Sequence, residues 1–108
     1  MIDEMTGRAV LKEAFESMGL HIREEFPLSV AEFSILIDGY DPVSRVGYEY
    51  ITTADGDREE LNPLVVAELD RLNAEGLVRL FLIDERFIAG RDSLREAALA
   101  FLRETLGG

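Results

Sequence analysis

The sequence predicts an α+β fold, a two-layer sandwich in which helices pack on a mixed sheet of about four strands, in the order α-β-β-β-α-β-α. Three observations predict this class. Three segments repeat apolar residues at helical spacing, four others alternate or run apolar as strands do, and glycine or proline stands at most of their boundaries. With 108 residues the chain is long enough for one compact domain, which we expect to span residues 1–108.

The first predicted element is a helix over Asp3–Met18. Its apolar stripe runs from Leu11 to Met18 at the spacing i, i+3, i+4, i+7, which places these side chains on one face. Gly19 follows directly and is suited to the left-handed residue that ends many helices. This helix should therefore cover a sheet with one apolar face.

Three strands are predicted next. Leu20–Phe26 alternates in polarity, and Pro27 after it blocks further pairing, so we expect a short edge strand. Glu32–Ile37 and Val46–Thr53 also alternate, and should form an antiparallel hairpin. The segment between them, Asp38–Arg45, is rich in the turn formers Gly, Asp and Pro, which predicts a loop longer than the tightest kind.

A second helix and a buried strand follow. Asn62 and Pro63 suit an N-cap and a first helical residue, and the helix should run to about Glu75, where Gly76 ends it. Leu77–Ile83 is the most apolar strand, which predicts a central position covered on both faces. It should run parallel to the second strand of the hairpin, because a helix connects the two.

The last helix is predicted from a capping box. Ser93 and Glu96 have the spacing of that motif, and an apolar stripe continues to about Leu106. The segment Arg86–Ala89 just before it allows two structures. It is either a fifth strand or a loop that places Phe87 in the core.

Composition excludes several functions. The 22 acidic residues outnumber the 11 basic ones and give a net charge of −11, so we expect no nucleic acid and no membrane partner. There is no cysteine, which excludes thiolate nucleophiles, disulfides and cysteine-based metal or redox sites. The first residues are acidic and no long apolar run follows, so we expect a cytoplasmic protein.

One group of acidic residues follows the ends of two strands that we expect to be parallel. Parallel strands end at the same edge of a sheet, where oxygen ligands would suit Mg²⁺ or Ca²⁺. An EF-hand loop starting at Asp55 would need an acidic residue where Val66 stands, so a calcium loop is excluded. We expect a solvated edge with no metal or cofactor, and retain a metal site as the alternative. Its residues would be Asp55, Asp57, Asp84 and Glu85.

A second group lies in the hairpin loop. An exposed aromatic side chain beside charges is typical of contact residues, and Tyr40 should lie near the tip of this loop. The alternative is that Tyr40 folds over the hairpin and that Asp41–Pro42 only makes the turn. The predicted partner-binding residues are Asp38, Tyr40, Asp41 and Arg45.

No catalytic residue is predicted. His21 is the single histidine, and it lies opposite the apolar side of an edge strand, where a surface position is expected. The chain has neither a G-x-S-x-G nucleophile turn nor a glycine-rich phosphate loop. An enzyme with a conventional nucleophile is therefore not indicated.

These observations predict a small acidic, non-enzymatic module that binds another protein. Its charge favours a basic partner, for example a basic toxin or nuclease that it would inhibit. Two alternatives remain open. One is a carboxylate-based enzyme that depends on a divalent metal, and the other is a homo-oligomeric structural domain, such as a homodimer, that pairs through an edge strand or a helix face.

Overall fold

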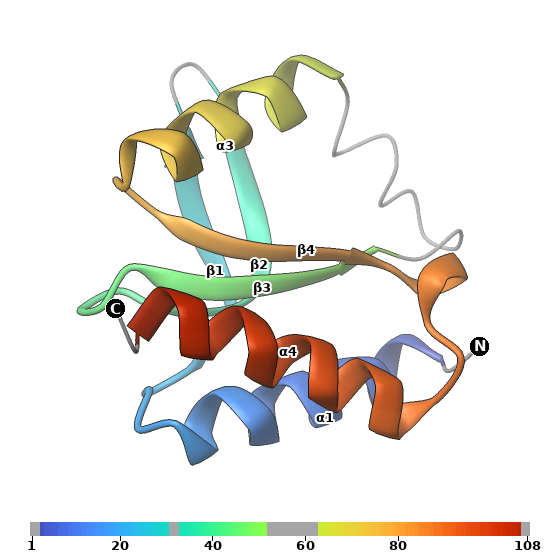
Figure 1. Cartoon of the computed structure of the whole chain (residues 1–108). Helices are drawn as coiled ribbons and strands as arrows, with labels where there is room; N and C mark the ends of the chain where they lie inside the picture. The colour runs from blue at the N-terminus through green and yellow to red at the C-terminus, as the bar shows by residue number, and fades with distance from the viewer. Residues whose placement is uncertain (1–2, 31–32, 52–62, 107–108) are drawn as a thin grey trace.

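The computed structural model describes residues 3–30, 33–51 and 63–106, and it confirms the α+β class and the order α-β-β-β-α-β-α (Figure 1). The first and middle helices begin and end within one residue of their predicted bounds. The elements are α1 (Glu4–Ser17), β1 (Arg23–Val30), β2 (Phe33–Asp41), β3 (Val46–Ile51), α3 (Pro63–Glu75), β4 (Arg79–Asp84), the 3-10 turn η1 (Glu85–Phe87) and α4 (Arg91–Leu106).

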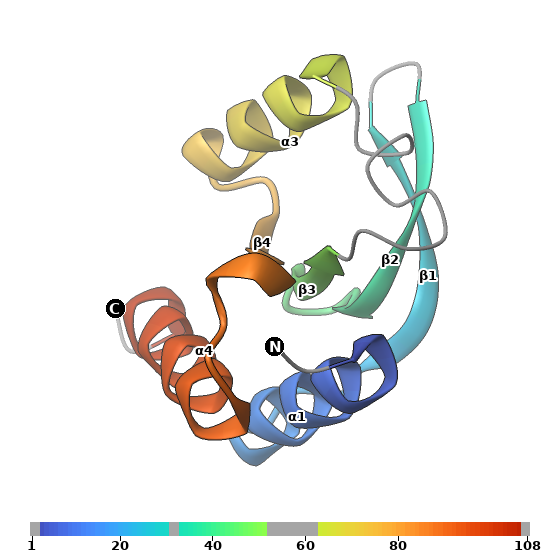
Figure 2. The ribbon, with the colours of Figure 1, turned by 90° about the vertical axis from the view of Figure 1, so that its right-hand side faces the viewer.

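The sheet is mixed and has the strand order β1-β2-β3-β4. β1 and β3 both pair antiparallel with β2, and β4 pairs parallel with β3. The predicted hairpin and the predicted parallel crossover through a helix are therefore confirmed. The helices pack on both faces, α1 and α4 on one and α3 on the other, so the sheet lies between helical layers (Figure 2).

The larger core lies between the sheet and the layer formed by α1 and α4. At its centre the ring of Phe15 meets Tyr48 of β3 edge to face at 4.9 Å and lies 6.2 Å from Phe101 of α4. Aromatic pairs of this kind contribute about 0.5–1.5 kcal/mol beyond their burial. The buried members are Leu11, Ala14, Phe15, Leu20, Val46, Tyr48, Tyr50, Ile88, Leu94, Ala98 and Leu102.

A second core lies on the opposite face, beneath α3. Val65 and Leu69 of α3 are buried against Leu80 of β4 and the β1–β2 hairpin. Phe81 and Ile83, the alternate residues of β4, pack instead against the first core. Helices thus cover both faces of β4. The buried members are Ile35, Ile37, Tyr40, Val65, Leu69, Val78 and Leu80.

Glycine ends two helices as predicted. Gly19 has φ 91° and Gly76 has φ 75°, both in the left-handed region that glycine enters without steric cost. The N–H of Gly19 donates to Glu16 O at 3.0 Å, and that of Gly76 donates to Asn73 O at 3.1 Å. These bonds satisfy carbonyls that a helix end would otherwise leave without a partner.

Two strand predictions need correction. β1 does not stop before Pro27 but continues to Val30, and Pro27 lies opposite Leu36. An edge strand tolerates this proline because it pairs on one side only. β4 is the other edge and not a central strand, since no strand follows it in the sheet order of the described residues. Its apolar character comes from helices on both faces and not from two neighbouring strands.

The approach to α4 also differs from prediction. The helix begins at Arg91, and Leu94 N donates to Gly90 O at 3.1 Å, so the predicted capping box at Ser93 is wrong by three residues. Of the two structures predicted for residues 86–89, the strand is excluded by η1 and the loop is confirmed. However, Phe87 is 77% exposed, and Ile88 fills the core position in its place.

Candidate functional site

The predicted contact loop is shorter than expected, because β2 continues through Asp38 and Tyr40 to Asp41. Tyr40 is only 3% exposed, and its ring lies 4.9 Å from that of Phe26. The expectation of an exposed Tyr40 at the loop tip is therefore wrong, because Tyr40 lies within β2 and is buried beside Phe26 of β1. Val43, which is 89% exposed, lies within the turn that remains.

Asp41 organises the turn. Its Oδ1 accepts hydrogen bonds from Val43 N at 2.9 Å and Ser44 N at 3.2 Å, and its Oδ2 accepts one from His21 N at 3.0 Å. Burial opposes the charged form, but the N–H groups of His21, Ser44 and Val43 outweigh it and hold the pKa of Asp41 below its ordinary value. Asp41 therefore ties the β2–β3 turn to the segment after α1. His21 itself is exposed, as predicted.

Replacing Asp41 with asparagine should lower the free energy of unfolding by about 1–2 kcal/mol at neutral pH, since hydrogen bonds to a charged acceptor are lost. The folded-state pKa is depressed, so this stabilisation exists above the unfolded pKa and disappears as pH falls through the folded value. Urea unfolding at neutral pH and at about pH 3 checks it. The difference in free energy of unfolding between wild type and Asp41→Asn should disappear in acid. The exposed Asp70→Asn is the control. An equal difference at both pH values would contradict the role of the charged Asp41 carboxylate.

Asp38 and Glu49 replace backbone acceptors where β2 and β3 separate. Backbone pairing ends at Gly39 and Tyr48. Beyond that point Asp38 N donates to Glu49 Oε1 at 2.9 Å, and Tyr50 N donates to Asp38 Oδ2 at 2.8 Å. Two side-chain carboxylates thus accept the hydrogen bonds that backbone carbonyl groups accept elsewhere in the β2–β3 ladder. Arg8 Nε of α1, 3.7 Å from Asp38 Oδ1, adds a positive charge at this point.

The buried acids are the residues that sequence reasoning missed. Asp41, Glu49 and Glu85 are 3%, 6% and 6% exposed, whereas we expected the carboxylates of this chain to face solvent. One signal was present for Glu49, which stands between Tyr48 and Tyr50 in the middle of a strand. An acid at the centre of an apolar strand indicates a specific hydrogen-bonding role, because burying it without partners is costly.

Arg45 is the most accessible of the predicted partner-binding residues. It is exposed, has φ 59°, and its N–H donates to Asp41 O at 2.7 Å to close the turn. Its carbonyl accepts a hydrogen bond from Arg79 N at the start of β4. Asp38, Tyr40 and Asp41 thus have structural roles, and contact of the whole set with a partner remains a prediction.

The acidic edge is described only in part. Ile51 pairs with Asp84, so the carboxyl ends of β3 and β4 lie together as predicted, while Asp55 and Asp57 lie outside the described residues. Asp84 accepts from Arg86 N at 2.9 Å and forms an ion pair with that arginine at 3.0 Å. Within residues 3–30, 33–51 and 63–106, no cluster of three potential metal ligands is found.

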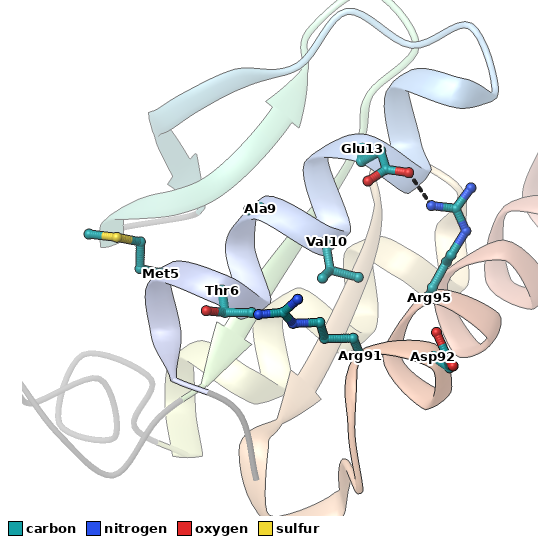
Figure 3. Close-up of a pocket in the computed structure, with 8 residues that line it drawn as sticks. All are labelled: Met5, Thr6, Ala9, Val10, Glu13, Arg91, Asp92 and Arg95. Carbon is teal, nitrogen blue, oxygen red and sulfur yellow. Dashed lines mark hydrogen bonds and ion pairs between the residues drawn. The ribbon is translucent and has the colours of Figure 1, made fainter.

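Two surface hollows flank Met5 on α1. The first, of about 490 Å³, lies between α1 and the start of α4, from which Arg91 and Arg95 project towards α1 (Figure 3). Arg95 forms an ion pair with Glu13 across the two helices. The second hollow, of about 420 Å³, lies between α1 and β1. Met5 borders both and is 83% exposed.

The second hollow is acidic. Glu4, Glu24 and Glu25 line it together with Met5, Arg8 and Ala9. Glu24 forms an ion pair with Lys12 at 2.9 Å, which lowers the pKa of this carboxyl, and Glu25 lies 3.7 Å from Arg8. Glu25 has φ 49°, a conformation that costs a residue with a side chain about 1–3 kcal/mol and often marks functional sites.

Comparisons of the chain with protein-family models, with curated proteins and with solved structures found no match. Among the residues that the structure describes, no helix is both long and apolar enough to cross a membrane.

Proposed function

We propose that this protein is a small non-enzymatic module that binds a basic protein partner through α1 and its two hollows. The observation that carries the proposal is Met5, an 83% exposed apolar side chain between two hollows on a helix whose opposite face is firmly buried. Methionine is adaptable in shape, so an exposed one is well suited to contact a partner. Leu11 and Phe15, both 0% exposed, hold the helix in place.

Charge supports a basic partner. Three glutamates and one arginine line the hollow between α1 and β1, so a lysine or arginine side chain would find carboxylates at its charged end and Met5 beside its aliphatic stem. The net charge of −11 adds long-range attraction and would accelerate encounter. Inhibition of a basic enzyme is one function that such a surface would serve.

The test uses a labelled basic amphipathic peptide of arginine and leucine as the probe, followed by fluorescence anisotropy. Met5→Ala combined with Glu24→Gln and Glu25→Gln should weaken binding about tenfold or more, equivalent to 1.4 kcal/mol. Val43→Ala combined with Asp70→Asn and Glu104→Gln removes the same charge and a similarly exposed apolar group elsewhere. This control should change binding less than about twofold.

Salt gives a second readout. Affinity for the probe should fall as NaCl rises from about 50 to about 300 mM, because screening weakens attraction between opposite charges. If both triple variants lost affinity for the peptide equally, net charge alone would attract the probe, and the proposed binding site on α1 would be wrong. Binding that does not saturate would do the same.

A further inference from the structure

The two edges of the sheet are built differently. β1 carries the charged residues Arg23, Glu24 and Glu25, the last in a left-handed conformation, and Pro27 follows. Charges, proline and a local distortion are the features by which edge strands resist pairing with other chains. β4 has none of them between its end residues, where the sequence is Leu-Phe-Leu-Ile. Among the described strands, these protective features therefore lie in β1 and not in residues 80–83 of β4.

Two residues of β4, Leu80 and Leu82, direct their backbone N–H and C=O groups away from β3, towards the outer edge of the sheet. Arg79 N donates to Arg45 O, so by the alternation of a parallel ladder residues 79, 81 and 83 face β3 and residues 80 and 82 face away. The side chain of Asn73 accepts from Leu80 N at 2.8 Å and closes that position. For the outward N–H and C=O of Leu82, no hydrogen-bond partner is found among residues 3–30, 33–51 and 63–106.

The side chains beside this edge are incompletely covered. Phe81 and Ile83 are only partly buried on the α4 side, and Leu82 is only partly buried on the α3 side. α3 and α4 lie on opposite sides of β4, so the edge faces outwards between two helices (Figure 2). A strand added here would gain backbone hydrogen bonds and cover apolar surface on both faces.

We propose that a second copy of this chain adds its β4 antiparallel to this β4, with the two Leu82 residues opposite each other. The charges of the strand favour that direction, since it begins with Arg79 and ends at Asp84. Antiparallel pairing brings the basic end of one strand to the acidic end of the other, whereas parallel pairing would place like charges together. The two Leu82 residues exchange two N–H···O bonds, and two four-stranded sheets become one.

Salt separates this surface from the one proposed for a basic partner. Two copies that each carry −11 repel one another, so screening should strengthen self-association while it weakens binding to a basic peptide. Size-exclusion chromatography with light scattering should give a two-chain mass whose fraction rises between about 50 and about 300 mM NaCl. A one-chain mass at both salt concentrations and at the highest protein concentration measured would overturn the dimer.

Cross-linking tests the register, because the chain contains no cysteine of its own. Facing residues of a hydrogen-bonded antiparallel pair have Cα atoms about 5.5 Å apart, within the range that a disulfide spans. Under mild oxidation Leu82→Cys should form a disulfide-linked dimer, whereas Val43→Cys, 89% exposed in the β2–β3 turn, should remain largely monomeric. Circular dichroism verifies that each variant is folded. Equal cross-linking of both would overturn the proposed register, and the wild-type mass decides the dimer if Leu82→Cys does not fold.

Discussion

Replacing Asp38 with alanine should lower the free energy of unfolding by about 3 kcal/mol. The change removes the acceptor of Tyr50 N, which lies in the core, and takes a carboxylate away from Arg8. The side chain of Asp38 is 14% exposed, so water would replace it only in part. A buried donor left without an acceptor costs more than an average hydrogen bond contributes. Urea unfolding followed by circular dichroism measures the effect.

Asp38→Asn is the matched variant, because it keeps an acceptor oxygen and loses only the charge. It should recover part of the loss, and Asp70→Ala on the exposed face of α3 should cost less than about 0.5 kcal/mol. If Asp38→Ala were as stable as the Asp70 control, the proposed bridge between β2 and β3 would be wrong. The result also affects binding studies, since a loss of partner binding in Asp38→Ala counts as a lost contact only if circular dichroism shows that the variant is folded.

Replacing Gly39 with alanine should cost about 1–3 kcal/mol, near the upper end of that range. Gly39 lies opposite Tyr48 in the β2–β3 ladder, and a Cβ at this position would come within 2.2 Å of the Tyr48 ring. Tyr48 is 1% exposed and packed against Phe15, so the ring has little room to move. Thermal unfolding should show a clear fall in Tm.

Two further variants separate steric conflict from a general effect of glycine replacement. Gly90→Ala adds the same methyl group where nothing lies within 4 Å, so it should cost much less. In the double variant with Tyr48→Leu, the cost of Gly39→Ala should shrink, because the ring that it meets is gone. Additive losses in the double variant would show that close approach to Tyr48 is not the reason for glycine at position 39.

The helices could be predicted because their signals are local. Three apolar stripes and two left-handed glycines, Gly19 and Gly76, lie within the segments that they define. The ends of the strands were harder to predict from the sequence. Asp38 and Gly39 are turn formers by propensity, yet both stand inside β2, because Glu49 binds the Asp38 backbone and Tyr48 lies over Gly39. Such contacts depend on strand register, which a local pattern does not contain.

The candidate site, like the strand ends, could be predicted only in part from local sequence patterns. The excess of acidic residues could be read from composition, but the prediction placed contact residues in a loop, whereas Tyr40 lies in β2 and is buried. The hollow beside Met5 and Arg91 forms only because α1 packs against α4, far away in the sequence. Likewise, the apolar run of β4 indicated two covered faces, and nothing in it showed how many strands lie beside it. Composition thus predicted an excess of acidic residues, whereas the positions of the two hollows depend on how the helices and strands pack.

The packing of α1 against α4 has a consequence for synthesis on the ribosome. Phe15 is made more than eighty residues before Phe101 and Leu102, which help to enclose the core around it. Closing so long a loop is entropically slow, and folding cannot finish until α4 has emerged. The nascent chain must therefore carry an uncovered apolar helix while the residues between α1 and α4 are made, and ribosome-associated chaperones should engage α1 until α4 docks.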